Sequence, residues 1–261
     1  MSLIRTLPDR AALVCTVRAV SRKPDIIVNL LSGNPEKLGS FFSEPVQVSD
    51  NYIYEIANYG SGVAPFYTTL AIWVGMTILV SLVKVHADAK GLGKLKPSQL
   101  YFGRYLTFFL LSQVQTFIIV LGDLYLLKIQ CVHPVSFIAT GAVTSLTFSL
   151  LIYSLTISFG DIGKALAVVV MVLQIAGSGG TYPIEALPAF FRAVYIFFPF
   201  PYAINAMREC IGGMYENILG KCYITLLLFG AASLVIGLVI RKPFIRLNHF
   251  IEKRMEDTEM L

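Results

Sequence analysis

Residues 62–83 read GVAPFYTTLAIWVGMTILVSLV and contain no charged side chain. A helix rises about 1.5 Å per residue, so this stretch is long enough to cross the roughly 30 Å hydrocarbon core of a bilayer. Residues 222–240, which read CYITLLLFGAASLVIGLVI, have the same character. Uncharged stretches of this length predict that the chain folds in lipid rather than in water.

The composition points the same way. The 261 residues are 56% hydrophobic and 14% charged, whereas a soluble domain carries about 25% charged residues. The net charge of +5 comes from basic residues that lie beside apolar stretches, not from a basic domain with interleaved aromatic residues. We therefore expect no nucleic acid partner.

Five apolar stretches predict an all-α integral membrane fold with about five transmembrane helices. They are residues 63–83, 101–127, 135–159, 162–178 and 222–240. The stretch 162–178 is at the short limit for a crossing. We expect an extracytoplasmic segment at residues 1–57, a membrane domain at 58–246 and a cytoplasmic tail at 247–261.

Residues 179–213 are apolar but are broken by glycines, prolines and a carboxylate. The break residues are Gly179, Gly180, Pro183, Glu185 and Pro188. Unpaired backbone in lipid costs several kcal/mol per group unless protein covers it. This pattern favours a broken, re-entrant pair of short helices at the outer side over a sixth crossing.

Basic residues predict the orientation of the chain. With five spans, one side collects eleven of them: Lys84, Lys90, Lys94, Lys96, Arg104, Lys164, Arg241, Lys242, Arg246, Lys253 and Arg254. The short loops of the other side hold four: Lys128, Arg192, Arg208 and Lys221. The richer side is cytoplasmic by the positive-inside rule, which predicts a multi-pass protein of the cell membrane with its N-terminus outside and its C-terminus in the cytoplasm.

The second apolar stretch carries a polar stripe. Ser112, Gln115, Thr116 and Asp123 lie on or beside one helical face. One interpretation is a translocation face, because a carboxylate inside a membrane is commonly functional. The other is that Asp123 lies near the outer interface and forms a hydrogen bond there.

The loop at residues 84–104 is basic and precedes the second span. Its residues Lys90, Lys94, Lys96 and Ser98 form a candidate cytoplasmic coupling loop, and Ser98 is a candidate helix cap. Such a loop docks a cytoplasmic partner in one interpretation and is a plain positive-inside anchor in the other.

Motifs for catalysis are absent from the sequence. There is no phosphate-binding loop, no H-E-x-x-H and no G-x-S-x-G, and the three histidines and four cysteines are scattered. We predict no enzymatic activity, no catalytic or metal site and no cofactor. Spacing alone leaves open whether Cys15, Cys131, Cys210 and Cys222 form a disulfide.

Three segments of the chain carry a family resemblance. They are NYGSGVAPFYTTLAIWVGM at 58–76, LKPSQLYFGRYLTFFLLSQVQT at 95–116 and GSGGTYPIEALPAFFRAVYIFFPFPYAINAMRE at 177–209. The chain resembles, over residues 29–246, the C-terminal membrane region of the YhgE/Pip (phage infection protein) family, which is similar in turn to ABC-2 type transporter permeases. Since family members look like one N-terminal span, a long outer region and five C-terminal spans, we expect this chain to be a C-terminal fragment or a shortened member.

The resemblance implies two functions. The first is an export permease subunit without its own ATPase, with the bilayer, a second copy of the chain and a separate cytosolic ATPase as partners; the loop at 84–104 would then be the coupling segment and residues 177–213 the outer gate. The second is a cell-surface receptor or envelope assembly scaffold, with a phage or an envelope-secretion component as partner.

Overall fold

The computed structural model describes residues 54–85 and 97–240. They belong to a compact unit that runs from Tyr54 to Leu261. The predicted outer segment up to residue 53, the coupling-loop residues Lys90, Lys94 and Lys96, and the predicted tail at 247–261 lie outside the described residues.

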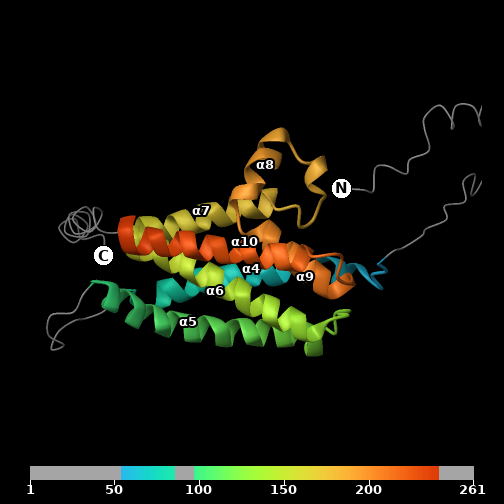
Figure 1. Cartoon of the computed structure of the whole chain (residues 1–261), viewed down its shortest axis with the longest axis horizontal. Coiled ribbons are helices and arrows are strands. Elements are labelled where there is room, and N and C mark those ends of the chain that lie inside the picture. The colour runs from blue at the N-terminus through green and yellow to red at the C-terminus, as the bar shows by residue number, and fades with distance from the viewer. Residues whose placement is uncertain (1–53, 86–96, 241–261) are drawn as a thin grey trace, which may run out of the picture. The chain divides into compact units, whose positions relative to one another are not determined.

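Every regular element in the two described ranges is helical, as Figure 1 shows. The long helices are α4 (Tyr59–Leu82), α5 (Pro97–Leu121, continued by a π-helical turn at Gly122–Leu126), α6 (Pro134–Phe159), α7 (Asp161–Gly177) and α10 (Ile218–Val235, continued by a π-helical turn at Ile236–Ile240). The short ones are α8 (Ala189–Val194), α9 (Phe200–Gly212) and single 3-10 turns at Ile184–Ala186 and Tyr195–Phe197.

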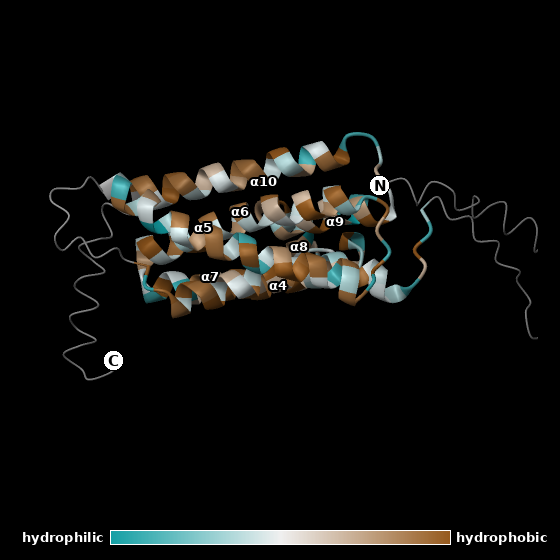
Figure 2. Cartoon of the chain, turned by 90° about the horizontal axis from the view of Figure 1, so that it is seen from below, coloured by the Kyte–Doolittle hydropathy of each residue, from teal (hydrophilic) through white to brown (hydrophobic). Residues whose placement is uncertain are grey.

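The predicted fold class is confirmed: the chain is an all-α membrane protein. Within residues 54–85 and 97–240, four helices have the length and hydropathy of a membrane crossing, namely Tyr59–Leu82, Ser98–Leu126, Pro134–Phe159 and Ile218–Val239. Figure 2 shows, by the colour of the ribbon, that hydrophobic residues predominate along the long helices. The fifth predicted span is α7, which has 17 residues and packs against α4 and α6 in the same bundle.

Local sequence explains where the helices begin and turn. The side chain of Asn58 caps α4 by accepting a hydrogen bond from the Ser61 backbone N–H at 2.8 Å. Pro134 occupies the first turn of α6, where its missing N–H costs nothing. Gly160 alone separates α6 from α7, and its φ of 60° is a conformation that glycine adopts without strain.

Gly160 lies at one end of the bundle and Cys131 at the other. The Gly160 end holds Gly160, the end of α4 at Leu82 and the start of α5. The Cys131 end holds the loop around Cys131, the start of α4 and the end of α9, which are tied together by hydrogen bonds described below.

The predicted re-entrant segment is present as a break in the bundle. The chain leaves α7 at the Cys131 end, and α8 then packs beside the end of α7, where Phe191 lies against Gly177 (Figure 1). It returns at Phe200, whose backbone N–H donates to the Gln174 side chain at 3.2 Å. From there α9 leads back to the Cys131 end, where the Cys210 carbonyl accepts from the His133 backbone N–H at 3.0 Å.

The core of the bundle is aromatic where α9 begins. Phe200 is fully buried and its ring lies 5.4 Å, between centroids, from both Trp73 of α4 and Phe148 of α6. The indole N–H of Trp73 donates to the Ala167 carbonyl of α7 at 3.2 Å. Side chains from four helices therefore meet at the start of α9.

One local prediction is wrong. Ser98 does not cap α5, because the helix already begins at Pro97 and Ser98 lies in its first turn. Proline is favoured at this first position because its φ suits a helix and its missing N–H is not needed there.

Candidate functional site

The polar stripe of α5 lies between α4 and α6. Ser112 is buried and donates to the Phe109 carbonyl of its own helix at 2.8 Å. The Gln115 amide lies so close to Gly75 of α4 that a Cβ built there would be 1.7 Å from the amide nitrogen. Thr116 is buried against Gly141 of α6 and its hydroxyl has no hydrogen-bond partner among the described residues. The face predicted for translocation thus forms helix contacts in this chain.

Asp123 sits in the π-helical turn that ends α5. Its side chain is 8% exposed, and one carboxylate oxygen accepts a hydrogen bond from the Thr68 hydroxyl of α4 at 2.6 Å. Thr68 also lies 2.8 Å from the Ala64 carbonyl. A π-helical turn often marks a functional position, because it re-aims the side chains around it. Here it aims a carboxylate at the neighbouring helix.

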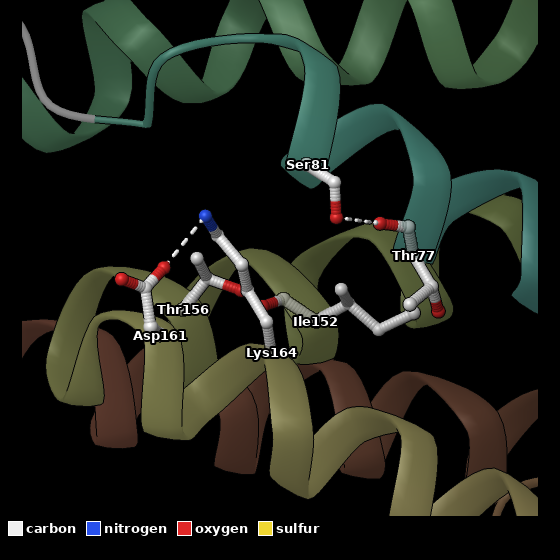
Figure 3. Close-up of polar contacts among 6 residues, drawn as sticks. All are labelled: Thr77, Ser81, Ile152, Thr156, Asp161 and Lys164. Atoms are coloured by element: carbon white, nitrogen blue, oxygen red, sulfur yellow. Dashed lines mark hydrogen bonds and ion pairs between the residues drawn. The ribbon is translucent and has the colours of Figure 1, made fainter. Parts of the chain in front are cut away.

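Charged residues at the Gly160 end make local contacts. Arg104 donates to the Lys84 carbonyl and its guanidinium lies 5.9 Å from the centre of the Phe108 ring. Lys164 pairs with Asp161 at 2.8 Å in the first turn of α7. Figure 3 shows this pair beside α6, with its side chains near those of α4. Of the predicted coupling loop, only Ser98 belongs to the described residues, and it is exposed.

The predicted outer break has an irregular backbone. Gly179 has a φ of +69°, which favours glycine. Gly180 packs directly under Phe66, since a Cβ there would lie 2.2 Å from the ring. Pro183 precedes the 3-10 turn that contains the exposed Glu185, and Pro188 precedes α8.

Arg208 of α9 ties this break to the bundle. Its guanidinium donates to the carbonyls of Gly179 and Gly180 at 3.1 and 2.9 Å. It also lines a cavity of about 220 Å³ at the Cys131 end. The cavity is lined by Tyr54, Ile56, Ser61, Gly62, Pro65, Arg208, Glu209, Ile211, Gly212 and Gly213. Arg208 therefore places a cation in the lining of a mainly apolar cavity.

Gln130 was not singled out from the sequence, although it organises the Cys131 end. Its amide oxygen accepts from the Ala57 N–H at 2.6 Å, and its amide nitrogen donates to the Glu55 carbonyl at 2.8 Å. Its backbone N–H donates to Ser61 at 2.9 Å. A loop glutamine carries no sequence signal for such contacts, which link residues about seventy positions apart.

Gln174 is the second residue that sequence reasoning missed. It is fully buried on α7, and its amide oxygen holds the Phe200 N–H, while its amide nitrogen has no partner among the described residues. The signal was available, because Gln174 carries the lone amide in the apolar stretch 162–178. Such a residue in a membrane helix usually faces protein rather than lipid.

Three cysteines belong to the described residues, and all three are free thiols: Cys131, Cys210 and Cys222. Cys131 lies in the loop between α5 and α6 and contacts the Cys210 carbonyl at 3.4 Å. Burial raises the pKa of the Cys131 thiol, and the nearby backbone of His133 opposes this in part. Cys15 lies outside the described residues.

Residues that could hold a metal do not gather in the part of the chain that the structure describes. No group of three or more His, Cys, Asp or Glu side chains lies close enough there to bind an ion.

The bundle with its broken segment defines a multi-pass, helical membrane protein of the permease type. The chain belongs to the ABC-2 family of transporter proteins, whose family model matches residues 26–239. It is 29% identical over 170 residues to a protein of Bacillus subtilis (strain 168) described as uncharacterized protein YhgE. That match covers 65% of this chain but 22% of the relative's length. No solved structure matches the chain. The predicted resemblance to the YhgE/Pip family is thereby confirmed.

Proposed function

We propose that the chain is the membrane subunit of an export permease whose ATP is hydrolysed by a separate cytosolic protein. The observation that carries the proposal is the re-entrant helix α9. It begins among Trp73, Phe148 and Gln174 inside the bundle and ends at the Cys131 end. A helix that starts inside a bundle has unpaired backbone groups at its first turn, and such groups are tolerated at membrane depth only where protein or a cavity surrounds them.

In this proposal α9 closes a path from the Cys131 end, which faces the outside. The Gly160 end faces the cytoplasm, where Lys90, Lys94 and Lys96 contact the ATPase. A second copy of the chain completes the path, as the resemblance to ABC-2 permeases implies. A reporter fused after Leu261 is expected in the cytoplasm, and an external reporter contradicts this orientation.

The test replaces all three loop lysines, Lys90, Lys94 and Lys96, with alanine. The matched control replaces Lys128, Arg192 and Lys221, three basic residues of the opposite loops. The full chain in nanodiscs is mixed with each cytosolic ATPase from its own cells, and association and ATP hydrolysis are measured. We expect stimulated hydrolysis that the loop variant loses and the control keeps.

Two outcomes contradict the permease. One is that no ATPase associates with the unaltered chain, and the other is that both variants behave alike. The alternative function, a receptor or scaffold, is favoured instead if deletion of residues 1–57 abolishes binding of a phage or envelope component while the bundle stays folded.

A further inference from the structure

The start of α9 is an unusual place for a helix N-terminus. The first N–H groups of a helix lack partners within it and carry a partial positive charge. In α9 this end is buried, because Phe200, Pro201 and Ala203 are all closed off from the surface. The Phe200 N–H donates to the Gln174 amide oxygen, the Ala203 N–H donates to the Pro199 carbonyl at 3.1 Å, and Pro201 has no N–H. What this end offers a ligand is therefore chiefly its partial positive charge.

The free nitrogen of Gln174 adds donors at the same place. The amide oxygen must face Phe200, since the other orientation would set two donors against each other. The amide nitrogen is then left with two N–H donors and no partner among the described residues, at a fully buried side chain. Leaving such a group unpaired costs about 1–3 kcal/mol, so it calls for an acceptor.

Other buried groups without partners are less telling. The hydroxyls of Thr116, Thr144 and Ser145 lie within helices, and a helical hydroxyl can rotate to a carbonyl of the preceding turn. The glutamine amide has no such local partner. Ser178, the C-cap residue of α7 one turn beyond Gln174, is also buried without a partner among the described residues, but its hydroxyl can likewise rotate to a carbonyl. It lies between Gln174 and the Cys131 end.

Arg208 lies next to Ser178 along this route. Ser178 is followed by Gly179 and Gly180, whose carbonyls hold the Arg208 guanidinium beside the outer cavity. From the cavity, whose lining holds Glu209 beside Arg208, a ligand moving inward would meet Arg208, the Gln174 amide and the positive end of α9. All of these favour negative charge, while the aromatic rings of Trp73 and Phe148 around Phe200 suit an apolar chain.

We propose that the first turn of α9 and the Gln174 amide bind the acidic group of an amphipathic anion that enters past Arg208. The inference rests on the proposed export function in that it names the substrate class, an apolar molecule with a carboxylate or phosphate. Half-helix N-termini hold anionic groups in other transporters by the same dipole effect.

The chain carries its own reporter for this site. Trp73 is its single tryptophan, is fully buried and lies 5.4 Å from the Phe200 ring. The full chain is placed in phosphatidylcholine nanodiscs without any ATPase, so the result does not depend on finding that partner. Sodium iodide is titrated at constant ionic strength, with caesium and acrylamide as cationic and neutral quenchers.

We expect iodide to quench Trp73 to saturation and caesium and acrylamide to have little effect. Gln174→Met removes the amide donors and keeps a weak acceptor for the Phe200 N–H, so iodide affinity should fall at least fivefold. Gln113→Met, which removes an amide of α5 that donates to the Ala142 carbonyl, should leave it unchanged. Quenching that rises linearly with concentration, or that is equal in the two variants, overturns the site.

Competition defines the ligand. Sodium octanoate should relieve the iodide quenching and 1-octanol should not, because the two share a chain and differ in charge. Equal relief by both overturns an anion site. Phosphatidylglycerol added to the nanodisc competes only if the acidic group belongs to a lipid, and so separates a lipid from a free anion as the source.

A second variant guards against misfolding of the first. If Gln174→Met fails to fold, Arg208→Gln removes the cation at the cavity and should weaken iodide binding at least threefold, while Arg192→Gln on α8 should not. Unchanged affinity in Arg208→Gln overturns entry past this residue.

Discussion

Helices α5 and α9 both carry polar groups into the bundle, but in opposite ways. The long helix α5 leaves much of its surface to lipid, and its buried Asp123 already has a hydrogen-bond partner on α4, while the Gln115 amide packs against Gly75. The short helix α9 buries eight residues, and the unpaired amide nitrogen of Gln174 lies at its start. Polar side chains alone do not reveal a path through a membrane protein. Whether their donors and acceptors are already paired better separates groups that hold helices together from groups that could bind a ligand.

The largest expected effect separates the two helices by packing. Phe200→Ala removes a fully buried ring at the start of α9 and should cost about 3–5 kcal/mol of stability. Phe117→Ala on α5, where the ring is 51% exposed, should change stability by less than about 0.5 kcal/mol. Denaturant unfolding followed by Trp73 emission measures both. Similar losses in both variants would mean that α9 is not packed as described.

Glycine substitutions should act with opposite signs. A Cβ at Gly163 of α7 would lie 2.2 Å from the Leu155 carbonyl oxygen, so Gly163→Ala should destabilise the protein by about 1–3 kcal/mol. Gly103 of α5 has open space around it, so Gly103→Ala should stabilise by about 0.5–1 kcal/mol through helix propensity. Thermal unfolding midpoints test the pair, and a shift of the same sign in both contradicts the close contact of α6 and α7.

Hydroxyl removal should separate a paired threonine from an unpaired one. Thr68→Val leaves the buried Asp123 carboxylate without its partner and should cost about 1–3 kcal/mol. Thr116→Val removes a hydroxyl that has no partner among the described residues and should be close to neutral. If Thr116→Val proves the more costly change in chemical unfolding, then the polar face of α5 has a ligand or partner of its own.

The smallest effect concerns the loop where the two regions meet. The raised pKa of Cys131 keeps its thiol protonated to a higher pH than an ordinary cysteine, whose pKa is about 8.5. In a Cys15→Ser background, maleimide labelling of Cys131 should therefore be slow at pH 8 and still accelerate as the pH rises further. A labelling rate that levels off by about pH 9.5, as expected for an ordinary thiol, contradicts this burial.

Hydropathy predicted the fold well because lipid allows few alternatives to a helix. The same signal predicted the break at residues 179–213 from Gly179, Gly180 and the prolines. It could not predict that α9 returns as far as Trp73, since depth depends on how aromatic side chains pack. The Asp123 partner was equally hidden, because Thr68 lies 55 positions away and their meeting depends on the rotation of two helices.

The candidate site on α5 stays a prediction, and the sequence drew attention to it for a reason that did not extend to α7. A carboxylate and two hydroxyls drew attention to α5, whereas the lone amide Gln174 in the stretch 162–178 was overlooked. Its environment is set by Phe200, which follows the broken segment and could not be placed from the sequence. Composition identifies which side chains avoid lipid, but not which of them stay unpaired.

The one-residue turn at Gly160 has a consequence for biosynthesis. With only Gly160 between them and Gly163 packed on the Leu155 backbone, α6 and α7 form a tight helical hairpin. Because α7 is short for an independent crossing, the two helices should leave the translocon together, with α6 carrying its partner into the bilayer. If the ribosome stalls before α7 is synthesised, α6 would then lack the partner helix with which it enters the bilayer.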